Sequence, residues 1–218
     1  MTRVLRLVLT LLLPMPLGAQ TPGTTKLAGR VPAEAIPAID SLIAAAVAES
    51  LPTEPLVQKA LEGSAKGIPP DRLVNGVRRG LLQLREARVL VDRALPGQPQ
   101  PEGHVAAVAA ALARGLPPSI AERMLMMAPG EPPAPALHAA ADLVAHRFNA
   151  DSAADLLVEA HAQGLRGDRL LDVATAADQE LQRGGGRTPT DALAHVRAML
   201  PNVPAPKVAV TPRGKTGS

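Results

Sequence analysis

The sequence predicts an all-α protein of about nine short helices, arranged as repeated helical hairpins. Apolar residues recur at intervals of three and four along most of the chain, as they do on one face of a helix. The same helix-stopping sequence returns between these periodic segments, and the only alternating β-branched stretch falls at 208–210. Such hairpins stack as a short α-solenoid or close into a compact bundle, and the apolar pattern fits both.

The first 19 residues have the layout of a secretory signal peptide. Arg3 and Arg6 precede an apolar run, and the small residues Gly18 and Ala19 end the segment. The apolar run is too short to span a bilayer, which requires about 20 apolar residues. We therefore expect cleavage after Ala19, no transmembrane anchor in the mature chain, and a periplasmic or secreted location.

Three further regions follow from composition. We expect residues 20–37 to be a flexible N-terminal segment, 38–200 to form the helical-repeat domain, and 201–218 to be a disordered basic tail. The chain contains no cysteine, so the domain has no disulfide even where an oxidising compartment would permit one. Its stability must come from packing.

Each predicted helix is marked by apolar residues that share one face. The charged residue Arg88 interrupts the third of these apolar faces. Two stretches rich in helix-breaking residues, 128–135 and 184–187, separate later helices. In chain order the faces are Ile39, Ile43 and Val47; Leu56, Val57 and Ala60; Val77, Leu81, Leu84 and Val91; Val105, Val108 and Leu112; Ile120, Met124 and Leu125; Leu137, Ala141, Val144 and Phe148; Leu156, Leu157 and Ala160; Leu170, Val173 and Ala174; and Leu193, Val196 and Leu200.

The stretch AKGIPPDRLV at 65–74 combines a helix stop with a helix start. Gly67 supplies the left-handed residue after the last helical turn, and Ile68 is the apolar residue that packs back on that turn. The proline pair that follows prevents the helix from continuing and suits the start of a new one. This stretch is therefore predicted to be a helix–turn–helix junction.

Related stretches predict further junctions. ARGLPPSIAE at 113–122 and AQGLRGDRLL at 162–171 place Gly115 and Gly164 at the position of Gly67, and weaker copies begin at 48 and 145. The three glycines are 48 and 49 residues apart, which suggests a duplicated helical unit. Alanine-rich helices also resemble one another by chance, so duplication remains a hypothesis.

The distribution of charge argues against nucleic acid as a partner. The formal charge of the chain is +3, but five of its 23 cations lie in 1–19 and 201–218, which leaves 18 cations against 20 acids in 20–200. Affinity for phosphate backbones requires clustered positive charge, and single strands are held by stacking on aromatic side chains. With no Trp, no Tyr and one Phe, the chain offers few such side chains.

Four residues form a candidate zinc site. His138, Asp142 and His146 stand four residues apart on one predicted helix, and His161 lies on the next. Zinc sites need three or four convergent ligands, whereas His138 and His146 are two helical turns apart, too far for one ion. A site would need a His–Asp pair completed by His161, and an ordinary polar helix flank is the simpler interpretation.

Two helix faces carry charge without an assigned role. The third predicted helix is the most basic; a solvated surface is the simpler interpretation, and an acidic partner or an anionic surface is the alternative. A second face combines Lys59, Glu62 and Lys66, where a solvated salt bridge or a binding role is possible. The arginines of the third helix are Arg78, Arg79, Arg85, Arg88 and Arg93.

The sequence favours binding over catalysis. It lacks a Gly-x-Ser-x-Gly elbow, a His-Glu-x-x-His motif, a phosphate-binding loop and a cysteine nucleophile, and no cofactor is expected. We expect a protein-binding or scaffold module of the cell envelope, with an unidentified envelope protein bound at the concave, alanine-lined face. The alternative is a small metal-dependent or hydrolytic envelope enzyme.

Overall fold

A computed structural model describes residues 26–97, 102–183 and 187–200. The predicted signal peptide, residues 20–25 and the predicted C-terminal tail lie outside these residues. None of the described helices is both long and apolar enough to span a membrane.

The prediction of an all-α fold of helical hairpins is confirmed. The described residues form nine helices and no strand. The helices are α2 (Ile36–Ala48), α3 (Glu54–Ala65), α4 (Pro70–Ala94), α5 (Glu102–Ala113), α6 (Pro118–Met127), α7 (Ala134–Ala145), α8 (Ala150–Ala162), α9 (Arg169–Gln182) and α10 (Pro189–Met199). Each corresponds to one of the apolar faces in the sequence.

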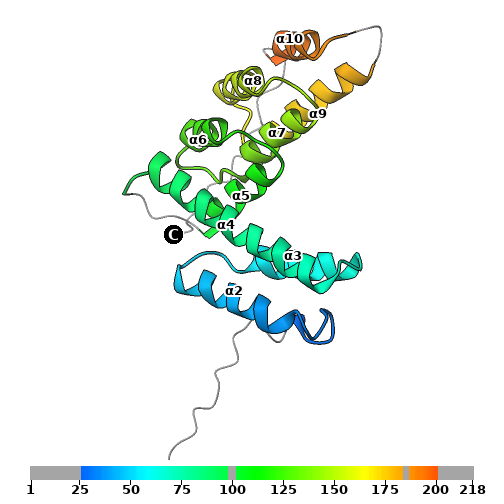
Figure 1. The fold of residues 1–218 in the computed structure, drawn as a ribbon. Helices are drawn as coiled ribbons and strands as arrows, with labels where there is room; N and C mark the ends of the chain where they lie inside the picture. The colour runs from blue at the N-terminus through cyan, green and yellow to red at the C-terminus, as the bar shows by residue number, and fades with distance from the viewer. Residues whose placement is uncertain (1–25, 98–101, 184–186, 201–218) are drawn as a thin grey trace, which may run out of the picture.

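The helices lie in two rows (Figure 1). α4, α6, α8 and α10 contact one another in succession, and α5, α7 and α9 form the second row. Helices of one hairpin also contact each other across the rows, and α2 and α3 pack on α4 at the N-terminal end. The arrangement is a stack in which each hairpin lies against the next.

α4 connects the N-terminal helices to the rest of the stack. With 25 residues it is about twice as long as α3 or α5, which have 12 each. Its first half packs on α3, since Gly63 lies against Leu73, and Arg93 near its end is paired with Glu122 of α6. A single helix therefore supports two successive hairpins.

The described part of the predicted flexible segment is packed on the fold. Leu27 and Val31 are buried, the Lys26 ammonium lies 2.7 Å from the Glu54 carboxylate, and the Ser64 hydroxyl donates to the Arg30 carbonyl at 2.7 Å. Both polar contacts reach α3. From Lys26 onward this segment therefore contributes two buried apolar residues and two polar contacts to α3.

Five helix ends share one geometry. Each is followed by a residue with positive φ and then by an apolar residue, whose N–H donates to a carbonyl five positions earlier at 2.8–3.1 Å. This pattern satisfies carbonyl groups that the helix end leaves free. The left-handed residues are Ser50, Gly67, Gly115, Arg147 and Gly164, with φ of 53°, 66°, 91°, 67° and 88°.

The equal spacing of the three glycines does not mark a structural period. Gly67 joins α3 to α4 and Gly115 joins α5 to α6, so two helices separate them. Gly164 joins α8 to α9, and three helices lie between Gly115 and Gly164. The interval is the same because α4 is long, and the position equivalent to Gly67 in the α7–α8 hairpin is Arg147.

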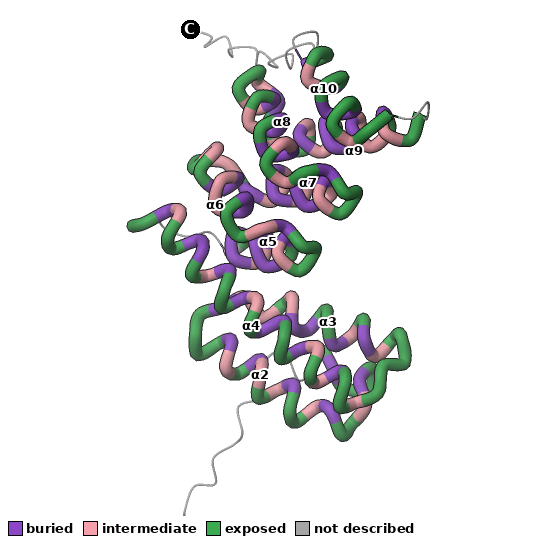
Figure 2. Tube along the Cα trace, turned by 45° about the horizontal axis from the view of Figure 1, so that its top comes forward, coloured by how far each residue is buried: buried purple, intermediate pink, exposed green. Residues whose placement is uncertain are grey.

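Alanine fills much of the core. α7 is buried on several sides, where it lies between α5, α8 and α9, and the interior of the stack is lined by buried residues (Figure 2). A methyl side chain lets helix backbones approach closely while still removing apolar surface from water. The buried alanines of α7 are Ala136, Ala139, Ala140 and Ala141.

Replacing Arg147 with glycine is expected to stabilise the protein. A side chain in the left-handed region costs about 1–2 kcal/mol, part of which is offset by the greater freedom of glycine in the unfolded chain. We expect Arg147→Gly to raise the free energy of unfolding by about 1 kcal/mol, measured by urea denaturation. Arg147→Ala is the control, because it removes the charge but keeps the strained conformation; equal stability of the two variants would contradict the assignment of this junction.

Candidate functional site

The four predicted zinc ligands do not converge. Three of them have partners in different parts of the stack, and no group of three or more His, Cys, Asp or Glu side chains suited to a metal occurs in the described ranges. His138 faces a groove between helices, Asp142 is paired with Arg114, His146 Nδ1 lies 2.8 Å from Asp178, and His161 Nε2 lies 3.6 Å from Glu131.

Ion pairs between helices account for many of the surface charges. Three pairs join the row α4, α6, α8 and α10: Arg93 with Glu122 at 2.8 Å, Arg123 with Asp155 at 2.6 Å, and Arg197 with Glu159 at 2.6 Å. Exposed pairs of this kind contribute less than about 1 kcal/mol each. They fix the register of neighbouring helices more than they stabilise the fold.

Two arginines of α4 hold the junction between α2 and α3. Arg85 donates through Nε and Nη2 to the Glu49 carboxylate at 2.8 and 2.6 Å, and Arg88 Nη2 donates to the Ser50 carbonyl at 2.8 Å. The hydrogen bond from Arg85 lowers the pKa of Glu49 below its ordinary value. Arg88 interrupts the apolar face of α4 because its side chain hydrogen-bonds the backbone just after the end of α2.

A groove of about 500 Å³ lies between α3 and α5. Alanines of α5 form one wall and α3 forms the other, while Gly80 and Leu84 of α4 lie between them. Ala134 and His138 of α7 extend the alanine wall. We call this feature the α3–α5 groove. The alanines of its α5 wall are Ala106, Ala107, Ala109, Ala110 and Ala113.

The groove exists because α3 and α5 both pack on the long α4. α3 approaches α4 closely at Gly80, where an added Cβ would lie 3.2 Å from Leu56 Cδ2 and 3.4 Å from Lys59 Cδ. The small side chains of α5 then leave the space beside α3 unfilled. Its surface is mostly apolar, and its polar or charged lining residues are Gln58, Lys59, Glu62, Gln83 and His138.

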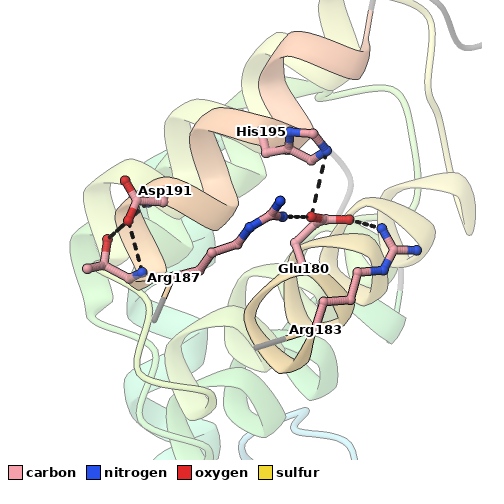
Figure 3. Close-up of polar contacts among 6 residues, drawn as sticks. Glu180, Arg183, Arg187, Asp191 and His195 are labelled. Carbon is pink, nitrogen blue, oxygen red and sulfur yellow. Dashed lines mark hydrogen bonds and ion pairs between the residues drawn. The ribbon is translucent and has the colours of Figure 1, made fainter. Parts of the chain in front are cut away.

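A second cluster of ionisable groups lies at the other end of the stack. Glu180 of α9 is only 2% exposed, and its carboxylate is bound by Arg183 and Arg187 and approached by His195 Nε2 at 3.6 Å. Figure 3 shows three side chains that reach Glu180: Arg183 from the end of α9, Arg187 from the segment before α10, and His195 from α10. The cluster closes the α9–α10 hairpin around a buried charge.

The start of α10 is capped beside this cluster. Asp191 accepts from the Thr188 N–H at 2.9 Å and from the Thr188 hydroxyl at 2.7 Å, and the Asp191 N–H donates back to that hydroxyl at 3.2 Å. These bonds, led by the one from the hydroxyl, lower the pKa of Asp191. The polar groups of this cluster have structural partners within the fold. We take the α3–α5 groove as the candidate functional site.

Two methionines of α6 differ in burial. Met124 lies in the core, as its place on the predicted apolar face requires, whereas Met126 is 56% exposed. The spacing of apolar residues in the sequence did not show which face of α5 lines the α3–α5 groove, because alanines lie on every face of this helix. The high alanine content of α5 was the available signal, since small side chains opposite a neighbouring helix leave a groove.

Comparison of the chain with protein-family models, with curated proteins and with solved structures found no match. The functional assignment therefore depends on the site alone.

We expect the buried Glu180 to contribute more to the free energy of unfolding than Glu159, an exposed acid that also pairs with an arginine. Glu180→Gln leaves two arginines without a carboxylate, and because these side chains are partly exposed we expect a loss of about 1–3 kcal/mol. Glu159→Gln removes the exposed pair between α8 and α10 and should cost less than about 1 kcal/mol. Chemical denaturation of both variants tests this order, and equal losses would contradict it.

His104 of α5 predicts a pH dependence of stability. Burial lowers its pKa below the ordinary value of 6.5, so the fold favours neutral imidazole. The stability that neutral His104 contributes is therefore fully present above pH 6.5 and is lost as the pH falls below it. The reason is that His104 binds a proton more readily in the unfolded chain than in the folded one. Denaturation between pH 7.5 and 5.5 should show a smaller loss for His104→Leu than for the wild type; an identical loss would contradict the assignment.

Proposed function

We propose that this chain is a protein-binding module of the cell envelope that holds a segment of a partner protein in the α3–α5 groove. The observation that carries the proposal is the groove itself, about 500 Å³ of mostly apolar surface between two helices. Apolar grooves between helices are a recurring site for amphipathic helices, which bury one face and keep the other in water. The envelope location is an expectation from the N-terminal sequence.

The composition of the groove favours a peptide over a small metabolite. Its α5 wall presents alanine methyl groups, which allow a bound backbone to approach closely. Polar side chains such as Gln58 and Gln83 can bind main-chain or side-chain amides of a partner. The groove is open along one side, so an occupant must itself carry a polar face.

The enzyme alternative receives no support from the described residues. Asp142, His146 and His161 have separate structural partners, and the described residues form no metal-binding group of three. Glu180, the other buried ionisable group besides His104 in the described ranges, is neutralised by arginines and does not line the groove.

A photo-crosslinking amino acid placed in the groove tests the proposal. At Ala110, which is exposed on the α5 wall, it should capture one partner protein in the native host, whereas at Val89, which is exposed on α4 outside the groove, it should not. Ala110→Trp fills the groove and should abolish co-purification of that partner, while Ala198→Trp on α10 should not. Equal capture from both positions, or a partner that Ala110→Trp still binds, would refute the proposal.

A further inference from the structure

A basic depression adjoins the α3–α5 groove. It lies on the α3–α4 hairpin, encloses about 270 Å³, and is lined by four cationic side chains and one carboxylate, a net formal charge of +3. Gly63 and Gly76 line it as well; Leu73 fills the space beside Gly63, whereas no atom would lie within 4 Å of a Cβ added at Gly76. The five charged residues are Lys59, Lys66, Arg72, Arg79 and Glu62.

The positive charge of this depression is not balanced within the described part of the chain. Lys66 Nζ lies 2.6 Å from Glu62, and this hydrogen bond lowers the pKa of the carboxyl group. Lys59, Arg72 and Arg79 form no ion pair with any other described residue. Most other arginines at helix contacts are paired, for example Arg85 with Glu49.

The depression and the groove share two lining residues on α3. Lys59 and Glu62, on successive turns of α3, line both of them. An occupant that lies along α3 therefore passes from an apolar, alanine-walled surface to a cationic one. It must combine an apolar face with negative charge at one end.

We infer that the partner segment is an acidic amphipathic helix, with its apolar face in the α3–α5 groove and its carboxylates over Lys59, Arg72 and Arg79. This inference rests on the proposed function and specifies the chemistry of the segment. Arginine binds carboxylates through two parallel hydrogen bonds, and charge complementarity also increases the rate of association.

Two other anionic partners fit the site less well. An acyl chain in an open groove would keep part of its surface in water, and each buried CH₂ contributes only about 0.8 kcal/mol. Single-stranded nucleic acid is held by stacking on aromatic side chains, and the single phenylalanine of the sequence, Phe148, is buried. An amphipathic helix satisfies both the apolar and the cationic surface.

A peptide library provides the test. Random 16-residue peptides displayed on phage are selected on the wild-type protein and counter-selected on Ala110→Trp, which fills the groove. The inference predicts that enriched peptides carry an excess of Asp and Glu next to an apolar face. Enriched peptides without excess acid would overturn it and leave the proposed function standing, whereas the absence of any enriched peptide would overturn both.

Charge reversal at neighbouring positions then locates the acidic end. Arg79→Glu should weaken binding of an enriched acidic peptide at least tenfold in fluorescence anisotropy at low salt, and higher salt should weaken wild-type binding. Arg78→Glu is the matched control, because it makes the same change one residue away, where the side chain contacts Asn75 and does not line the depression. Equal weakening by both variants would overturn the inference, as would phosphatidylglycerol vesicles bound through Arg79 in preference to acidic peptides.

Discussion

Burial of the apolar stripe of α4 is the interaction on which the rest of the structure depends. This helix packs on α2, α3, α5 and α6, and residues such as Val77, Leu84 and Val91 are almost fully buried. At a rise of 1.5 Å per residue it is roughly 37 Å long, enough to support two hairpins side by side. Because α3 and α5 use different parts of α4, the space between them remains open as the α3–α5 groove.

Alanine determines how the other helices pack. Without Trp, Tyr or Cys, the chain cannot fill wide gaps with aromatic rings or close them with disulfides, so its helices must approach closely. α7 packs closely on several sides through its buried alanines, against α5, α8 and α9. Where α5 faces α3 there is no such close partner, and the same small side chains form a binding surface. Composition thus links the packing of the core to the shape of the candidate site.

The sequence predicted the helices and their junctions well, because both are local. Gly67 and the proline pair after it specify a helix end whatever the remainder of the chain does. Long-range partners were not predictable: the contact of Arg88 with the Ser50 carbonyl and the burial of Glu180 depend on helix packing. The spacing of Gly115 and Gly164 was misleading, since two and three helices span equal intervals. The basic depression combines Lys59 with Arg79, which only the α3–α4 hairpin brings together.

Hydrogen–deuterium exchange on the complex with the native partner tests the central claim most directly. Binding in the α3–α5 groove predicts slower exchange in residues 55–62 of α3, in 80–84 of α4 and in 103–113 of α5, with no change in α10. Protection confined to α6, α8 and α10 would contradict the account, because it would place the partner on the opposite row of the stack.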